Sequence, residues 1–457
     1  MLFDIEFVRK FNFIKMLKQK RTLILTLIIL IAGNANSQNS LQFNSLDSLF
    51  KYAEKKSVAI KTGQQQSLLA KWTKIASIGN TINLRSPFTA SWTDNIKLPI
   101  SYLPAEAFGG PAGTLKQVSL GQQYVSSYAI TPQIDIINPS AWARIKSADL
   151  NKQLTEINNL ITKKNLFESI SATYYNIVSV QSQIISAEQS ISAADTILSI
   201  AKNKFALGII REQDFNNTTI NLLTAQDKLI QLSTTLEQNY NSLKVLCELN
   251  PESSLKINET MDLNNNPDIP KEAASSLAEK QARLQSDYLR SELNAARLTS
   301  FSPTLSIIFN QTWQQNSNIG FMDANPYKFS SQYFGLRLTV PFPFDVNRFS
   351  QDYTAKINYN ISAINSTHSS LQNKINNKQL GLDYVKANSS YRTSKQINDL
   401  KMINYQKSLN QYTEGIISTD VLLTAFTDKI NAQLNYSAAF ANLKYAQSKI
   451  NINNTIQ

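Results

Sequence analysis

The strongest pattern in the chain is a seven-residue repeat of apolar positions between residues 170 and 205. A large apolar side chain recurs every seven residues, at Ile170, Ile177, Ile184, Ile191, Leu198 and Phe205. A smaller residue follows three positions after each of the first five, at Thr173, Val180, Ala187, Ala194 and Ala201. Such heptads are typical of coiled-coil helices. A helix from about Ala141 to Phe205 would be on the order of 95 Å long at 1.5 Å per residue.

The same arrangement occurs twice, about two hundred residues apart. After Gly208 the chain turns back, and leucines keep the 3.5-residue spacing down to Pro251. The second copy predicts a long helix to Tyr412, a turn at Gly415 and a helix from Thr419 to about Ile450. We therefore predict two structural repeats that complete one another's core, at 41–256 and 271–450, joined by a polar linker at 257–270.

Shorter elements precede the long helices in each repeat. Alternation of apolar and polar residues predicts strands at 85–97, 123–137, 303–313 and 333–342. Within the last of these, Phe334, Leu336 and Leu338 alternate with Tyr333 and Arg337. Helical spacing predicts helices at about 46–79 and 271–298, and the Pro-, Gly- and Ser-rich stretch 98–122 is interpreted as a long loop.

The N-terminus has the pattern of an export signal. Basic residues between Met16 and Arg21 precede the apolar stretch Leu23 to Ala32, which is about half the length of a membrane-spanning helix. Small residues before Gln38 predict cleavage there, so that 1–37 is a signal peptide and 38–457 is the mature chain. The start codon, Met1 or Met16, stays open.

The composition argues against most enzyme chemistry. One histidine, His368, and one cysteine, Cys247, cannot form a Cys/His zinc set, and no Gly-rich phosphate loop is present. Cys247 lies late in a helical pattern and is interpreted as a small core or interface residue, and His368 lies in an apolar helical stripe and is interpreted as a packed or surface histidine. The net charge of +12 falls to +8 without residues 1–37 (six basic and two acidic residues), and the basic residues are spread out. We therefore predict no catalytic residue, cofactor, metal or nucleic-acid partner.

Four strands with alternating apolar positions pose a packing problem. Their pattern suits a bilayer, yet four strands cannot close a barrel, and an open edge is not tolerated in lipid. The chain must either oligomerise or pack the strands against its own helices. Because the smallest transmembrane barrels have eight strands, three or more copies would satisfy the edges.

The chain resembles the TolC family of outer-membrane efflux and secretion channels. The resemblance rests on the opening Leu46-Asp47-Ser48-Leu49-Phe50-Lys51-Tyr52-Ala53, the strand starts at Pro87 and Pro303, and Val340-Pro341-Phe342-Pro343-Phe344, together with the two glycine-containing hairpin tips. It implies a mixed α and β membrane protein: a homotrimer whose twelve-stranded β-barrel in the outer membrane continues as a periplasmic α-helical barrel. It also implies a passive exit duct of a tripartite efflux pump or type I secretion system, opened by a periplasmic adaptor and an inner-membrane pump.

The resemblance also implies where the functional residues lie. The tips would be the adaptor-contact sites, formed by Leu207, Gly208, Ile209, Glu414, Gly415 and Ile416. Acidic residues near the tips would form the periplasmic gate, and the candidates are Asp214 and Asp420. The match is imperfect, because Asp420 stands one residue earlier than in the family pattern and Val421 follows it. Asp420 could instead cap the helix that begins there.

Two other classes of protein share some of these features. A periplasmic coiled-coil adaptor would share the heptads and the signal peptide, but it would lack four alternating strands. An exported enzyme such as a carbohydrate hydrolase requires a placed pair of carboxylates, whereas the charges here fall mostly on helix surfaces. The sequence does not indicate the cargo.

Overall fold

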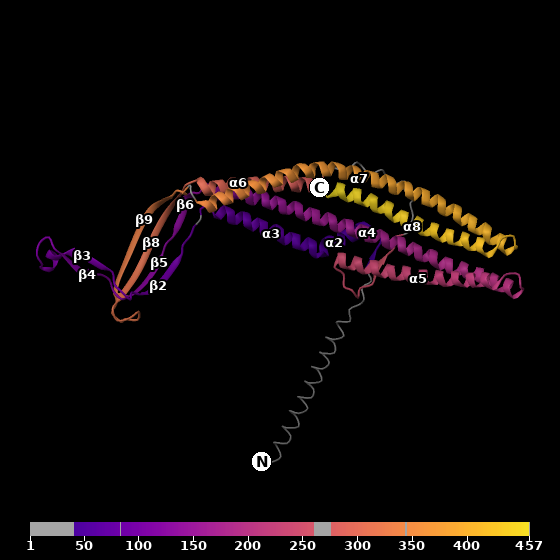
Figure 1. Cartoon of the computed structure of the whole chain (residues 1–457), viewed down its shortest axis with the longest axis horizontal. Coiled ribbons are helices and arrows are strands. Elements are labelled where there is room, and N and C mark those ends of the chain that lie inside the picture. Colours follow the sequence, from indigo (N-terminus) through magenta and orange to yellow (C-terminus); the bar gives the residue numbers. More distant parts are fainter. Residues whose placement is uncertain (1–40, 83, 260–275, 343–344, 457) are drawn as a thin grey trace, which may run out of the picture. The chain divides into compact units, whose positions relative to one another are not determined.

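The computed structural model of the chain describes residues 41–82, 84–259, 276–342 and 345–456 (Figure 1). The predicted signal peptide, the linker from residue 260 onward, residues 271–275 of the second repeat, and Pro343 with Phe344 lie outside the described residues. Two compact units are present, and each takes segments from both halves of the sequence. The hairpin unit contains the described residues of Met1–Ser57, Leu166–Ile269 and Tyr384–Lys449, and the sheet unit contains those of Val58–Asn165, Pro270–Asp383 and Ile450–Gln457.

Two long helices confirm the prediction from the heptads. Both α4 (Pro139–Ala206) and α7 (Val346–Thr413) have 68 residues, one in each half of the chain. Each turns back into a shorter helix, α5 (Glu212–Cys247) after α4 and α8 (Thr419–Thr455) after α7. The remaining α-helices are α2 (Leu46–Lys56), α3 (Val58–Gly79) and α6 (Leu277–Phe301).

The heptad positions of α4 make the core of the hairpin unit. From Val180 to Ala201, the smaller heptad residues are more deeply buried than the larger ones. Val180, Ala187, Ala194 and Ala201 are all buried. Val180 and Ala187 pack with Leu232 of α5. Ala194 packs instead with side chains of α7 and α8, including Tyr412. Small residues let α4 approach its neighbours closely, while the larger apolar side chains flank the contact.

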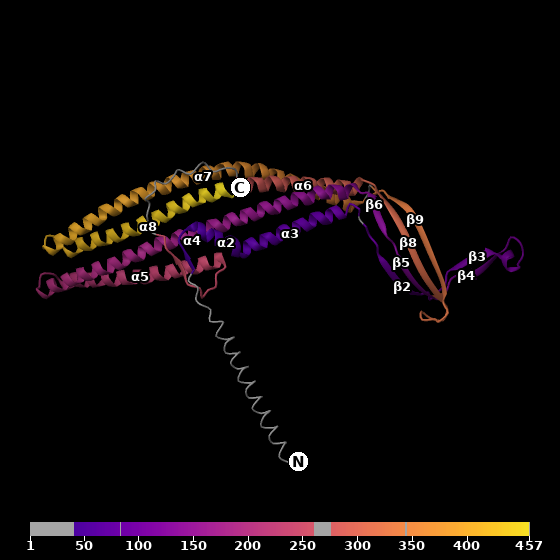
Figure 2. The same cartoon turned by 180° about the vertical axis from the view of Figure 1, so that it is seen from behind.

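Five strands form one antiparallel sheet in the sheet unit (Figures 1 and 2). Its members are β2 (Phe88–Asp94), β5 (Tyr124–Ile130), β6 (Gln133–Ile137), β8 (Thr304–Ser317) and β9 (Tyr327–Thr339). The order is β2, β5, β8, β9, and β6 also pairs with β8. Strands from the two halves of the sequence therefore meet at the pairing of β5 and β6 with β8.

The strand predicted at 123–137 is two strands, because the pairing is interrupted at Thr131 and Pro132. The N–H of Thr131 donates to the carbonyl of Pro87 at 3.2 Å, and the carbonyl of Pro132 accepts from Phe309 at 2.9 Å. Proline has no N–H to give to a ladder, so the strand ends there. The register on β8 is the same before and after the break, from Ile130 opposite Gln311 to Gln133 opposite Ile308, and it shifts only between Asp135 and Ile137. Because β5 and β6 follow one another along the same edge of β8, the sheet has four strand positions.

The alternation predicted for the last strand is confirmed, but its bounds differ. β9 begins at Tyr327, six residues before the predicted start, and ends at Thr339, so that Val340 and Phe342 lie beyond it. The apolar pairs on one face are Phe334–Phe309, Leu336–Ile307 and Leu338–Leu305. Arg337 lies opposite Ser306 on the other face. One face of this strand pair is therefore apolar near the helices and the other is polar.

The stretch 98–122, predicted as a loop, contains a hairpin. β3 (Ile100–Pro104) pairs with β4 (Leu115–Ser119), and the 3-10 helix η1 (Ala105–Phe108) lies between them. Its two strands are only five residues long, which is too short for a clear alternation of apolar and polar residues. The Pro and Gly residues around them therefore favoured the interpretation as a loop. A second pair, β1 (Leu41–Phe43) with β7 (Leu255–Ile257), is parallel, and three residues are too few to show a period.

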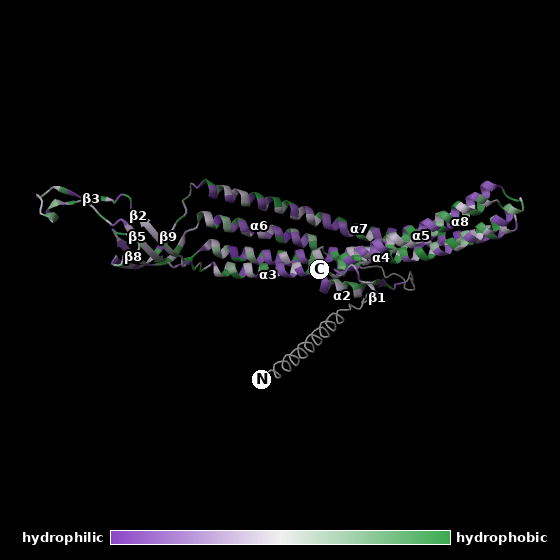
Figure 3. Ribbon diagram, turned by 90° about the horizontal axis from the view of Figure 1, so that it is seen from below, coloured by the Kyte–Doolittle hydropathy of each residue, from purple (hydrophilic) through white to green (hydrophobic). Residues whose placement is uncertain are grey.

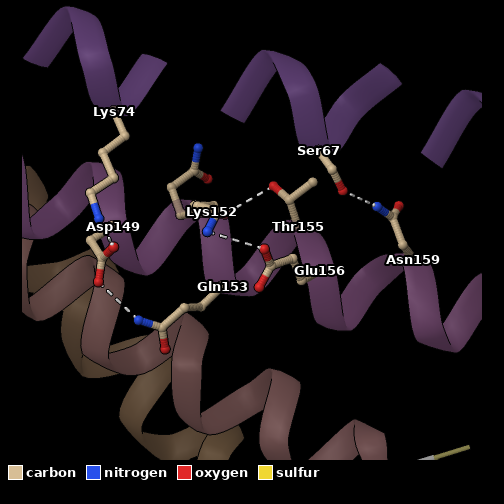
Figure 4. A network of polar contacts seen from close by, with 9 residues as sticks. Ser67, Lys74, Asp149, Lys152, Gln153, Thr155, Glu156 and Asn159 are labelled. Carbon is tan, nitrogen blue, oxygen red and sulfur yellow. Dashed lines mark hydrogen bonds and ion pairs between the residues drawn. The ribbon is translucent and has the colours of Figure 1, made fainter. Parts of the chain in front are cut away.

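Polar contacts hold α3 against α4 in the sheet unit (Figure 4). The Lys74 ammonium lies 2.5 Å from the Asp149 carboxylate, and this hydrogen bond lowers the pKa of Asp149. The Asn159 amide donates to Ser67 at 2.8 Å and to the carbonyl of Gly63 at 2.7 Å. A Cβ at Gly63 would stand only 2.8 Å from the Asn159 side-chain oxygen, so any larger residue would displace the Asn159 amide.

Large apolar side chains are exposed on both α3 and α7, and the mixture of hydrophobic and hydrophilic residues on these helices can be followed in Figure 3. On α3 the most exposed are Leu69 (68%) and Trp72 (65%), and on α7 Ile364 is 69% exposed. Across the described ranges of the chain, every helix is too short or too polar to cross a bilayer.

Candidate functional site at the two hairpin tips

The two hairpin tips have the same backbone geometry. Gly208 has φ +70° and Gly415 has φ +79°, the left-handed region that favours glycine. After each glycine, the next N–H donates five residues back, from Ile209 to Lys204 and from Ile416 to Gln411, both at 2.9 Å. These are the hydrogen bonds of a Schellman motif, which satisfies the last carbonyls of a helix. The predicted turn positions are confirmed, and the two copies end their long helices in the same register.

The predicted tip residues are mostly exposed. Leu207 is 75% exposed, and Ile209 and Ile416 are each 65% exposed. Glu414 is exposed beside Gly415. Apolar side chains held at a turn between long helices are costly to leave in water, and their exposure makes each tip suitable for contact with a partner.

The two candidate gate residues lie in different settings. Asp214 is in the first turn of α5, where its carboxylate accepts from the backbone N–H of Arg211 at 3.3 Å and lies 3.4 Å from the Arg211 side chain. Asp214 therefore caps its helix and is only 15% exposed at the side chain, whereas Arg211 is 77% exposed. Asp420 is in the first turn of α8 and is exposed. An exposed acidic residue there also suits the positive end of the helix dipole.

The ends of the two long helices are joined by one side chain. The Lys204 ammonium of α4 donates to the backbone carbonyl of Tyr412 in α7 and lies 4.0 Å from the centre of the Tyr412 ring. The Tyr412 hydroxyl is 3.3 Å from that of Thr419, at the start of α8. The link therefore connects the hairpin of one half of the chain to the hairpin of the other.

Beneath the link lies an aromatic core. Tyr412 is 1% exposed and Phe426 is fully buried, and the Phe426 ring lies 5.5 Å from that of Tyr405. The Lys429 ammonium is 4.8 Å from the centre of the Tyr405 ring, and its burial lowers the pKa of Lys429. Cation–π contact offsets part of the cost of burying this charge. The tip side of the hairpin unit thus combines close apolar packing with buried polar groups.

Sequence patterns did not indicate Lys204, Tyr405 or Lys429. Lys204 stands four residues before its turn, yet its partner is 208 residues away in the sequence. Only the spacing of Tyr405 and Tyr412, seven residues apart, gave a signal, and that spacing is common to all apolar heptad positions. Contacts between the two halves cannot be read from either half alone.

The two residues considered for chemistry stay in packing or surface positions. Cys247 is fully buried at the end of α5, and burial raises its pKa to about 12, as expected for a core thiol. His368 is exposed on α7. Among the residues that the structure describes, no group of three or more His, Cys, Asp or Glu side chains could hold a metal ion.

The chain is similar to outer membrane channels in part of its sequence and in its fold. Residues 107–247 match the family model described as outer membrane efflux protein. The fold matches the outer membrane protein VceC of Vibrio cholerae with a TM-score of 0.67 and 13% identity, covering 90% of this chain and 96% of VceC. It also matches the CmeC outer membrane channel of Campylobacter jejuni (TM-score 0.67, 14% identity, 90% and 84% covered). The open state of the MtrE outer membrane channel of Neisseria gonorrhoeae matches with a TM-score of 0.62, 14% identity and 88% of each chain covered.

No curated protein sequence matches the chain. The family match in sequence and the likeness in fold nevertheless agree on one class, the outer membrane efflux channels, and the resemblance predicted from the sequence is confirmed. Residues 107–247 are thus similar in sequence to the outer membrane efflux proteins, and the whole chain has the fold of the solved outer membrane channels.

Proposed function

We propose that three copies of the chain assemble into one duct. The open edges of the sheet carry this proposal. Within the described residues, β2 pairs only with β5 and β9 pairs only with β8, so both outer edges have free backbone groups. The side chains of Phe334, Leu336 and Leu338 on β9 are at least 64% exposed. A sheet with an exposed apolar face and two free edges is stable in lipid only when it closes.

Three copies would give twelve strand positions, enough for a transmembrane barrel. β9 of one copy would then pair with β2 of the next. The exposed apolar side chains of α3 and α7 would meet in the same way, because they lie on the helices that follow or precede these outer strands. The helices would thereby continue the barrel into the periplasm.

The function proposed for this assembly is a passive exit duct of a tripartite efflux pump or type I secretion system. The hairpin tips would be its regulated end. Leu207, Ile209 and Ile416 supply apolar contact surface for a periplasmic adaptor, and the link from Lys204 to Tyr412 holds the two hairpins of one copy together. An adaptor that binds the separated hairpins better than the joined ones would open the duct.

Asp214 and Asp420 remain the candidates for the gate. Three copies of an aspartate near one axis would attract cations and repel one another. We expect Asp420→Asn to change single-channel conductance or cation block in planar bilayers, because the Asp420 side chain is exposed. Asp214→Asn should leave the start of α5 nearly as stable, because the amide oxygen can still accept from the backbone N–H of Arg211. Unchanged conductance in both variants would remove both residues from the gate.

The assembly is tested by its mass. The mature chain extracted in mild detergent should have the mass of three copies, and boiling should shift its migration in gels to that of one copy. Separated membranes should contain it in the outer-membrane fraction. A monomer in mild detergent, or recovery with soluble periplasmic proteins, would contradict the proposal.

A further inference from the structure

The sheet unit has a cleft of about 800 Å³ between α4, α6 and α7 that has a strongly basic lining. Its cationic side chains are Lys146, Arg290, Arg297 and Lys356. Asp287 also lines the cleft, and Asp352 lies 3.3 Å from Arg297. Four cations thus face two carboxylates.

A neighbouring cleft on the same helices is uncharged. α6 and α7 form a second cleft, whose lining includes Gln285, Asn358 and Asn365 and has no charged side chain. On α6, Arg290 and Arg297 are seven residues apart and therefore share one side of the helix. Of these two clefts, only the first therefore offers positive charge to a ligand.

The basic cleft lies close to the sheet. Lys146 is seven residues after the start of α4 at Pro139, and Lys356 is ten residues after the start of α7 at Val346. Arg297 is four residues before the end of α6 at Phe301. At 1.5 Å per residue, these cations are within about 15 Å of the points where the helices join the strands.

Each of the three helices also carries an exposed aromatic residue on the sheet side of its cation. Trp142 is four residues from Lys146, Phe301 is four residues from Arg297, and Phe349 is seven residues from Lys356. These spacings place each aromatic residue on the same side of its helix as the cation. The three aromatic side chains are about half exposed, at 48–55%.

This order is that of a protein surface at the edge of a bilayer. Aromatic rings gather at the level of the lipid head groups, and lysine and arginine just beyond them attract anionic head groups. We propose that the cleft binds the phosphate head group of an anionic phospholipid in the periplasmic leaflet of the outer membrane. The proposal rests on the proposed function, since it requires the sheet to be in that membrane.

The bound head group would neutralise the excess of positive charge in the cleft. Phosphate is a good partner for this set, because arginine donates two parallel hydrogen bonds to it and lysine acts as a point charge. One head group would contact α4, from the first half of the chain, and α6 and α7, from the second. It would therefore tie both halves together just below the strands.

Native mass spectrometry of the assembled protein with added phosphatidylglycerol tests the proposal. The triple variant Lys146→Gln, Arg290→Gln, Lys356→Gln should bind this lipid more weakly by roughly tenfold or more. The control variant Lys378→Gln, Lys386→Gln, Lys395→Gln removes the same charge from exposed positions farther along α7, and it should bind as the unchanged protein does. Phosphatidylethanolamine, which carries no net charge, should bind more weakly than phosphatidylglycerol.

Equal affinity of the two triple variants would overturn the proposal, whether both bind well or both bind poorly. Displacement of the lipid by an equal excess of inorganic phosphate would also overturn it, because the cleft would then hold a free anion rather than a lipid. The same spectra give the oligomeric mass. A trimer that does not retain phosphatidylglycerol contradicts this inference alone, whereas a monomer contradicts the proposed function.

Discussion

At the scale of single residues, the contact of Lys204 with Tyr412 is the most informative. A charged hydrogen bond to a backbone carbonyl is worth about 1.5–3 kcal/mol and a cation–π contact about 0.5–2 kcal/mol. Lys204 makes both with the same residue, across the boundary between the two halves of the chain. A free energy of this size would suffice to bias the proposed equilibrium between joined and separated hairpins.

We predict that Lys204→Met increases opening of the duct. Methionine keeps much of the aliphatic packing but loses both polar contacts, so the population of open channels should rise by roughly tenfold in planar bilayers. Lys202→Met is the matched control, because Lys202 is exposed two positions earlier on α4. If the two variants have the same open population, the link does not hold the tip.

At the scale of elements, β9 separates two environments within one strand. Leu336 and Arg337 are neighbours in the sequence, yet they pair with an apolar and a polar residue of β8, Ile307 and Ser306. The period of two therefore assigns Leu336 to the face with Phe334 and Leu338, and Arg337 to the opposite face. The sequence of β9 alone indicates one apolar and one polar face. The register with β8 shows that the same two faces extend onto β8.

This assignment predicts opposite effects of two neighbouring substitutions. Leu336→Arg should impair assembly by about 2–4 kcal/mol if the residue faces lipid near the bilayer midplane. Arg337→Ser should leave assembly intact, because its side chain would face the polar interior. The yield of heat-resistant oligomer from membranes measures both effects, and equal yields from the two variants would show that the faces are wrongly assigned.

The sequence predicted the long elements far better than the short ones, for a physical reason. A heptad sustained from Ile170 to Phe205 has many chances to show its period, and α4 follows it closely. The strands β1 and β7 have three residues each, and they form because Phe43 and Ile257 are buried in the folded unit. Likewise, the turns at the tips could be predicted from Gly208 and Gly415. The contact between Lys204 and Tyr412 could not, because the two residues are far apart in the sequence and meet only in the folded chain.

At the scale of the whole molecule, α3 and α7 have exposed apolar faces that, like the open edges of the sheet, would be covered by a neighbouring copy. Trp72 and Ile364 are more than 60% exposed in a single copy, and burying each would contribute on the order of 1.5–3 kcal/mol. In the proposed trimer these contacts recur three times. Assembly should therefore depend on the helices as well as on strand pairing.

We predict that Ile364→Glu prevents or weakens trimer formation. The substitution would place three unpaired carboxylates between the copies while leaving the exposed surface of a single copy nearly unchanged. Asn365→Glu adds the same charge one position later, about 100° around the helix, in the lining of the uncharged cleft. Mass measurement in mild detergent should find trimer for Asn365→Glu and a smaller species for Ile364→Glu; trimer for both would exclude the proposed contact.

The parallel pairing of β1 with β7 has a consequence for the order in which the chain folds after export. Leu41 pairs with Leu255, so more than two hundred residues must emerge on the far side of the inner membrane before the first strand meets its partner. A long sequence separation makes such a contact slow to form. The earliest part of the mature chain to arrive is therefore among the later parts to be fixed. During that interval the backbone groups of β1 are unpaired, so this segment should be among the most accessible to proteases.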